Sequence, residues 1–193
     1  MLDVPCLDDS HRYWMGNRQL DGCTSMLADA GFIDRRWFTD AACLRGCYVH
    51  TAIEWDLAGD LDEATLDPAL RPYLDAARAF LHDSEARVVA VEPPLADPTF
   101  GIAGKPDLVG YFYGKPALPD WKSGGAERWH RYQGAIYKHL ARVNQMFPEP
   151  LIESYAVYLH DTGKYTLGDK SDRQDAAIAQ AVITIAQAKR SHS

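Results

Sequence analysis

The sequence has no long hydrophobic run. No segment approaches the roughly 20 consecutive apolar residues that a helix needs to cross a membrane. Its first residues, Met-Leu-Asp-Val-Pro-Cys-Leu-Asp-Asp, carry acids where a secretory signal peptide needs a basic start and an apolar stretch. These two absences predict a protein with no membrane partner that resides in the cytoplasm.

Cysteine is missing from most of the chain. The four cysteines, Cys6, Cys23, Cys43 and Cys47, all lie in its first quarter. Because no secretory signal precedes them, we expect reduced thiols. Cys43 and Cys47 are one turn apart on a predicted helix, and we expect them to pack in the core rather than to bind a metal.

Positive charge is also scarce. The chain has 20 lysines and arginines against 27 aspartates and glutamates, a net charge of −7. A protein that binds phosphates uses lysine and arginine side chains for these contacts. The negative net charge excludes a surface that is basic overall. The acids concentrate in residues 56–67 and 169–175, while Lys122, Arg128 and Arg131 lie close together in the sequence. This distribution predicts a local basic rim on an acidic body.

The length of 193 residues suits one sizeable core and is short for two ordinary domains. We expect a single domain over residues 1–193, with a hairpin and a short helix in residues 1–38 and the core in residues 39–190. Gly16-Asn17 marks the hairpin, and Thr24 or Ser25 can cap the short helix. Hydrophobic periodicity predicts the remaining helices at residues 39–57, 66–84, 127–147 and 172–189, and strands at residues 87–95, 152–159 and 163–167. This order predicts an α/β fold with a central mixed β-sheet flanked by helices.

The most informative stretch runs through residues 104–137. Two runs rich in β-forming residues flank Gly114-Lys115-Pro116, which predicts an antiparallel hairpin. If Gly114 and Lys115 form the tight loop, Asp107 pairs with Lys122 and Val109 pairs with Asp120. Side chains alternate along each strand, so Asp107, Asp120 and Lys122 then share one face at one end of the sheet. A slip of one residue would turn Asp107 away from the other two.

This cluster of charges has a specific chemistry. Two carboxylates held close together repel each other, and a divalent cation such as Mg²⁺ or Mn²⁺ removes that cost. Such a cation polarises a phosphoryl oxygen and lowers the pKa of a coordinated water. Lys122 can orient or deprotonate that water, or stabilise charge on the phosphate. The cluster therefore predicts a metal-dependent nuclease.

The same residues carry a family resemblance. Asp107, then Asp120-Trp121-Lys122, then Gln133-xxx-Tyr137 resemble the PD-(D/E)XK nuclease superfamily and, within it, the RecB-like branch of exonuclease domains. That branch has a histidine on an earlier helix, often followed one turn later by a glutamate, and His50 and Glu54 fit. The likeness covers roughly residues 40–140. It implies a restriction-endonuclease-like core and a deoxyribonuclease, more an exonuclease than an endonuclease, in bacterial or phage DNA recombination, repair or processing.

The resemblance implies a role for each matched residue. His50, Asp107 and Asp120 would hold Mg²⁺ or Mn²⁺, with the Trp121 carbonyl as a further ligand, and Lys122 would act on the water or the phosphate. Glu92, which ends a predicted strand, would lie near the metal. The expected contacts to the substrate come from polar and basic residues after the hairpin, namely Ser123, Arg128, Arg131, Gln133 and Tyr137.

Some RecB-like nucleases also carry an iron–sulfur cluster held by one cysteine before the nuclease core and three after it. This chain has no cysteine after Cys47. We therefore predict no iron–sulfur cluster.

Other interpretations remain open at this stage. His50 can be a packing histidine, Glu92 a surface carboxylate, Gln133 a helix-surface residue and Tyr137 a core aromatic. The whole protein can also be a non-catalytic nucleic-acid-binding accessory protein with a nuclease fold, a structure-specific endonuclease or a metal-dependent phosphatase. The predicted partner is DNA, single- or double-stranded and with a free end; a homo-oligomer or a recombination partner protein is also compatible with the sequence.

Overall fold

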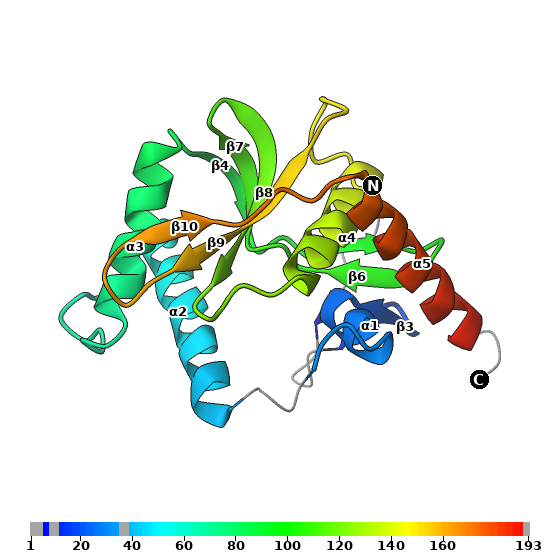
Figure 1. Ribbon diagram of the computed structural model, residues 1–193, viewed down its shortest axis with the longest axis horizontal. Coiled ribbons are helices and arrows are strands. Elements are labelled where there is room, and N and C mark those ends of the chain that lie inside the picture. The colour runs from blue at the N-terminus through cyan, green and yellow to red at the C-terminus, as the bar shows by residue number, and fades with distance from the viewer. Residues whose placement is uncertain (1–5, 8–11, 35–38, 191–193) are drawn as a thin grey trace.

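The computed structural model describes residues 12–34 and 39–190, and the backbone of residues 6 and 7 (Figure 1). Within this part of the chain, five helices and ten strands form an α/β fold with two five-stranded sheets. Each sheet contains both parallel and antiparallel neighbours. The predicted fold class is confirmed, and the second sheet is an addition to it. No helix in the described ranges is both long and apolar enough to cross a membrane.

The central sheet has the strand order β10-β9-β8-β7-β4. Its strands are β4 (Arg87–Val91), β7 (Leu108–Phe112), β8 (Lys115–Lys122), β9 (Glu153–Leu159) and β10 (Tyr165–Leu167). Strands β8 and β9 are parallel, and every other neighbouring pair in this sheet is antiparallel. A parallel pair needs a crossover connection, which here contains helix α4 (Trp129–Val143).

The second sheet has the order β1-β2-β3-β6-β5. Its strands are β1 (Cys6–Leu7), β2 (Tyr13–Met15), β3 (Arg18–Gly22), β5 (Leu95–Asp97) and β6 (Ile102–Gly104). The predicted hairpin around Gly16-Asn17 is confirmed as β2 and β3, with Gly16 at a φ of 57°. Strands β5 and β6 are not predicted by the sequence, because three residues are too few to show an alternating pattern.

The other helices are α1 (Cys23–Asp29), α2 (Asp40–Ala58), α3 (Arg71–Asp83) and α5 (Arg173–Arg190). The Thr39 side chain accepts a hydrogen bond from the Ala42 amide at 3.2 Å, which fixes the start of α2. Gly59 ends the same helix in a left-handed conformation with a φ of 78°. The predicted cap of α1 by Thr24 or Ser25 is wrong, because Gly22 occupies the capping position.

Helices cover both faces of the central sheet (Figure 1). Val109 and Leu118 point to the face with α1, α4 and α5, whereas Phe112 and Trp121 point to the face with α2 and α3. Because side chains alternate along β8, Asp120 and Lys122 lie on the α4 face together with Leu118. This alternation positions the two charged side chains beside the helix that carries Gln133.

The hairpin between β7 and β8 corrects the predicted register. Its loop is Tyr113-Gly114, with positive φ angles of 53° and 72°, as in a type I′ turn. Gly110 pairs with Ala117, whereas the predicted loop would have paired it with Pro119. The proposed pairings of Asp107 with Lys122 and of Val109 with Asp120 are therefore wrong. A shift of two residues leaves every side chain on its predicted face, so the inference about the shared face is unaffected.

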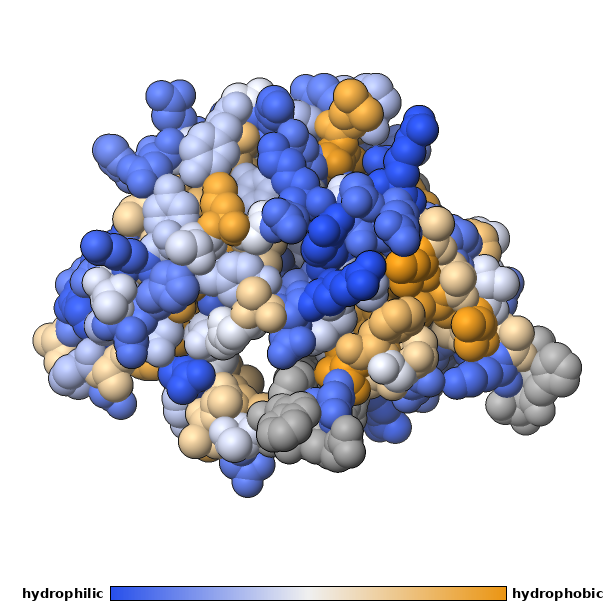
Figure 2. All heavy atoms as spheres, viewed as in Figure 1, coloured by the Kyte–Doolittle hydropathy of each residue, from blue (hydrophilic) through white to orange (hydrophobic). Residues whose placement is uncertain are grey.

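Two further predictions are wrong. The predicted strand over residues 87–95 is too long, because β4 ends at Val91; it lies at the edge of its sheet, and Val89 is 54% exposed. Cys43 and Cys47 are exposed on α2 rather than packed in the core, whereas Cys23 is buried. Figure 2 shows hydrophobic side chains at the surface along α5. Ile185, which lies on this helix, is 48% exposed.

Phe80 lies at the centre of an aromatic cluster between α3 and the sheet. It is fully buried, and the centroid of its ring lies 5.6 Å from that of Phe112 and 5.5 Å from those of Trp121 and Tyr165. We expect Phe80→Leu to lower the free energy of unfolding by about 1–2 kcal/mol, because the smaller side chain leaves a gap. Urea unfolding would measure this loss. Phe32→Leu, at a site that is 40% exposed, should change stability much less.

Candidate metal and catalytic site

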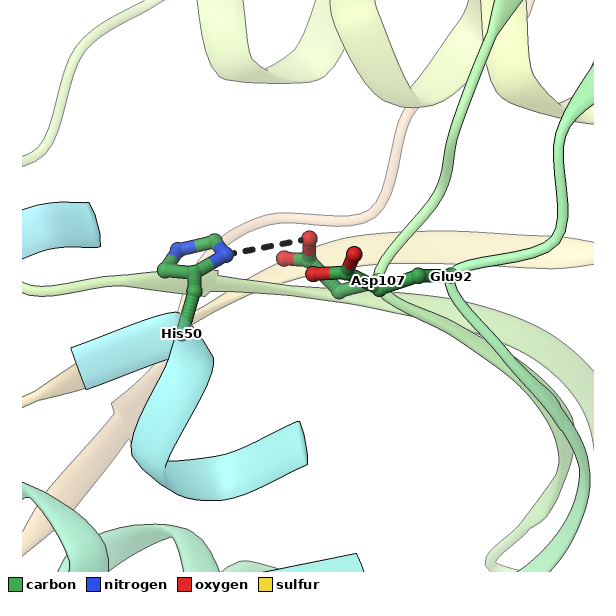
Figure 3. Close-up of side chains that lie close together, drawn as sticks. All are labelled: His50, Glu92 and Asp107. Atoms are coloured by element: carbon green, nitrogen blue, oxygen red, sulfur yellow. Dashed lines mark ion pairs between the residues drawn. The ribbon is translucent and has the colours of Figure 1, made fainter. Parts of the chain in front are cut away.

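Three potential metal ligands converge from different elements. His50 extends from α2, Glu92 follows β4, and Asp107 precedes β7 (Figure 3). One ligand atom from each of these residues lies within 4.8 Å of the others. His50 Nδ1 is 3.2 Å from Asp107 Oδ1. The predicted convergence of His50 with Asp107 is therefore present in the structure, with Glu92 as the third member of the group.

The backbone fixes the two carboxylates. The Trp121 amide donates to Asp107 Oδ2 at 2.7 Å, which ties the side chain of Asp107 to β8. The Glu92 amide donates to the Asp107 carbonyl at 2.9 Å. Glu92 has a φ of 47°, a conformation that is uncommon for a residue with a side chain and that is often found at functional sites. This turn ends the strand and leaves the Glu92 carboxylate beside Asp107.

Both ring nitrogens of His50 face acceptors. Nδ1 faces Asp107, and Nε2 lies 3.2 Å from the Trp121 carbonyl oxygen. An imidazolium donates from both nitrogens, so this arrangement suits the protonated ring. Burial opposes the charge, but the charge and hydrogen bond of Asp107 raise the pKa of His50 to about 9. A metal ion that binds His50 must displace this proton.

Lys122 is held by two partners on its face of the sheet. Its ammonium group forms an ion pair with Asp120 Oδ2 and donates to Gln133 Oε1 at 2.9 Å. Gln133 Nε2 in turn donates to the Tyr137 hydroxyl at 3.1 Å. Helix α4 thereby fixes the position of the ammonium group through Gln133 and Tyr137. Neither is a surface residue, because each is only 6% exposed.

The buried charged groups of Asp107, Asp120 and Lys122 shift each other's pKa values. Burial and the nearby Asp107 carboxylate raise the pKa of Asp120 to about 6, despite the opposing effect of Lys122. Burial favours the neutral form of Lys122, but Asp120 and Asp107 raise its pKa above the ordinary value. Burial also disfavours an ionised Asp107, whereas His50, Lys122 and the Trp121 amide lower its pKa. Lys122 is therefore an ammonium group at neutral pH.

The donor set fits a divalent cation. Glu92 forms an ion pair with Lys105, Asp120 with Lys122, and Asp107 with His50. Each of these three carboxylates therefore has a partner whose positive charge offsets its own negative charge. Carboxylate oxygens are preferred ligands of Mg²⁺ and Mn²⁺, and an imidazole nitrogen is also a common metal ligand.

The remaining predicted site residues differ in their surroundings. Asp120 lies on the shared face but outside the group of three close ligand atoms, and the Trp121 carbonyl faces His50. Arg128 is exposed at the N-terminal end of α4, and Ser123 follows β8. Arg131 donates to Asp175 and Asp172, both at 2.8 Å, so its guanidinium stabilises the junction of α4 with α5.

An open cleft of about 420 Å³ lies beside this cluster. Its lining includes two residues of the cluster, His50 and Lys122, together with Arg45, Trp129 and His130. Arg45, His130 and Lys105, the ion-pair partner of Glu92, are not predicted from the sequence. His130 could have been found by its position, since it lies one turn before Gln133 on the same helix. The spacing of five residues between Arg45 and His50 gives no such indication.

The pKa of His50 predicts a pH dependence of the metal-free protein. Below pH 6.5, the ordinary value, the folded and unfolded states both hold the proton, and the stabilisation is complete. As the pH rises through about 9, the folded protein loses the proton and this stabilisation is lost. Urea unfolding in EDTA should therefore show a free energy of unfolding that falls over this range. The fall should be smaller in His50→Gln; an equal fall in both proteins would contradict the assignment.

Comparisons with known proteins give structural neighbours only. No protein-family model matches this chain, and no curated protein matches it. A protein from Eubacterium rectale, provisionally assigned as an exonuclease, is 15% identical, with 83% of this chain and 69% of that chain covered and a TM-score of 0.46. An alkaline exonuclease from Laribacter hongkongensis is 13% identical, with coverage of 88% and 87% and a TM-score of 0.43. Its complex with dAMP is also 13% identical with the same coverage and a TM-score of 0.41. These similarities are to exonuclease structures and are weak in both identity and superposition.

Proposed function

We propose that this protein is a metal-dependent deoxyribonuclease that hydrolyses phosphodiester bonds, with a single nuclease domain over residues 1–193. The observation that carries the proposal is the convergence of His50, Glu92 and Asp107 beside the Lys122 ammonium group at an open cleft. The order of these residues in the sequence, which resembles the RecB-like branch of the PD-(D/E)XK nucleases, supports an exonuclease. DNA recombination, repair or phage DNA processing in the cytoplasm is the proposed setting.

His50, Glu92 and Asp107 would hold Mg²⁺ or Mn²⁺, with Asp120 and the Trp121 carbonyl close by. When bound, such a cation supplies Lewis-acid activation of a phosphate and of a water molecule. Asp107 would hold the cation through Oδ1, which faces His50, because its Oδ2 accepts from the Trp121 amide. The other two ligands are Glu92, which follows the end of a strand, and His50, which lies on a helix. These positions fix the direction of both side chains.

Lys122 acts as a charge stabiliser rather than as a base. Its raised pKa keeps the ammonium group protonated, so it cannot take a proton from water at neutral pH. The group can instead donate to a non-bridging oxygen of the reacting phosphate and stabilise the negative charge that develops there. Asp120 and Gln133 hold the ammonium group for this role, and Tyr137 orients Gln133. Ser123 and Arg128 are the proposed contacts to the rest of the strand.

The test uses end-labelled linear DNA, both single- and double-stranded, beside covalently closed circular DNA. With Mg²⁺ or Mn²⁺ we expect the linear substrates to be shortened from an end, and we expect EDTA to stop the reaction. An intact circle supports an exonuclease, whereas a cut circle identifies an endonuclease. DNA binding without cleavage of any substrate in either metal would favour the non-catalytic accessory protein.

A further inference from the structure

Arg45 has donor groups that the protein does not satisfy. It lies on α2, five residues before His50. One of its terminal nitrogens, Nη2, donates to the Ser123 carbonyl at 3.3 Å, while Nε is buried without a hydrogen-bond partner. A buried donor without an acceptor destabilises the folded protein, so such a group in a native structure requires an explanation.

In the described part of the chain, Arg45 has no carboxylate partner, in contrast to Arg78, Arg131 and Arg190. Arg78 pairs with Asp56 and Glu63, Arg131 with Asp172 and Asp175, and Arg190 with Asp21. Within the ranges that the structure describes, no carboxylate lies within ion-pair distance of Arg45. Its positive charge is therefore available to an anion.

Arg45 also lies where two clefts meet. It lines the cleft that contains His50 and Lys122, and it lines a second cleft of about 440 Å³ on β9 and the following turn. Residues 123–125, which include two glycines, line both clefts. Along α2, the backbone positions of Arg45 and His50 are separated by an axial rise of about 7.5 Å. Arg45 thus lines the same cleft as His50 without belonging to the group of potential metal ligands.

We propose that Arg45 binds a backbone phosphate of the DNA strand, next to the phosphate that reacts at the metal site. A guanidinium presents several N–H groups in a planar fork that matches phosphate oxygens, and the bond to Ser123 holds this fork at the boundary of the two clefts. The strand then continues from the first cleft past residues 123–125 into the second. Two exposed acids, Glu127 and Asp161, also line these clefts, and solvent screens them. This inference rests on the proposed function for the identity of its ligand.

The experiment measures binding of a short fluorescein-labelled oligothymidylate by anisotropy in EDTA, where binding is separated from cleavage. Four full-length proteins are compared at several salt concentrations: the unmodified protein, Arg45→Gln, Arg45→Lys and Arg87→Gln. Glutamine retains an N–H donor for the Ser123 carbonyl. Arg45→Gln therefore removes the positive charge while keeping a hydrogen bond to residues 123–125. Arg87 is the matched control, because it lies at the far end of β4 from Glu92 and stacks on Tyr111. Thermal melting checks that every variant is folded.

We expect Arg45→Gln to weaken binding about tenfold and to reduce the slope of log K against log salt by about 0.7, the value for one phosphate contact on a single strand. Arg45→Lys should keep that slope, because it keeps the charge, and Arg87→Gln should resemble the unmodified protein. An unchanged affinity and slope in Arg45→Gln would overturn the proposal, as would an unmodified protein that binds no oligonucleotide.

The two proposals fail in different ways. If the unmodified protein binds DNA and responds to Arg45→Gln but cleaves nothing with Mg²⁺ or Mn²⁺, the phosphate contact stands and the nuclease assignment falls. If the unmodified protein cleaves DNA and Arg45→Gln binds like Arg87→Gln, the nuclease assignment stands and the contact falls.

Discussion

Replacing Lys122 by methionine is expected to lower the rate of DNA cleavage about 10³-fold, or about 4 kcal/mol in the activation barrier. Methionine has a similar length but offers neither a charge nor a hydrogen bond to the reacting phosphate. Asp120 and Gln133 position the buried ammonium group, and methionine can form neither contact. Single-turnover cleavage of end-labelled DNA at saturating Mg²⁺ would measure this loss.

Lys115 provides a matched control on the same strand. It is the first residue of β8, Lys122 is the last, and each pairs with a carboxylate; Lys115 Nζ lies 3.4 Å from Glu153 Oε1. Seven residues of extended strand place the two lysines about 23 Å apart. Lys115→Met should therefore cleave DNA at the unmodified rate. If Lys122→Met retained that rate as well, the ammonium group would have no part in catalysis.

Replacing Asp107 by asparagine is expected to weaken Mn²⁺ binding strongly and to lower cleavage about 10³- to 10⁴-fold, because the site loses an anionic ligand of a metal ion that supplies several kcal/mol. Asparagine has the same size, and its amide oxygen can still accept from the Trp121 amide, so the strand-end geometry should persist. The ring of His50 also loses the carboxylate that raises its pKa. Titration calorimetry with Mn²⁺ and a cleavage assay would measure the two losses.

Asp97 is the matched control for Asp107. It is also a buried aspartate paired with a histidine, since His139 Nε2 lies 2.7 Å from Asp97 Oδ2. Asp97 additionally accepts from the backbone amides of Thr99 and Phe100. Asp97→Asn should lower the thermal stability without changing the affinity for Mn²⁺. Equal Mn²⁺ affinities for Asp107→Asn and the unmodified protein would exclude Asp107 as a ligand.

Local patterns in the sequence account for the elements that carry the site. Thr39 and Gly59 mark the two ends of α2, and the β-forming runs around Gly114 mark the hairpin. The shared face of Asp107, Asp120 and Lys122 follows from the two-residue period of strands, which a shift of two residues does not alter. The turn itself was misplaced because Tyr113 adopts a positive φ that a tyrosine rarely takes.

The sequence by itself therefore determined the α/β class, the order of most elements, and the faces on which the charged residues of the hairpin lie, because these depend on neighbours within a few positions. Only the tertiary structure decided that Glu92, rather than Asp120, lies among the close ligand atoms with His50 and Asp107, and that Arg131 pairs with the acids beside α5. It also decided that Arg45 lies at the cleft with its Nε buried and without a hydrogen-bond partner. These contacts join residues far apart in the chain, and their distances depend on how α2, α4 and α5 pack against the sheet, which no local period encodes.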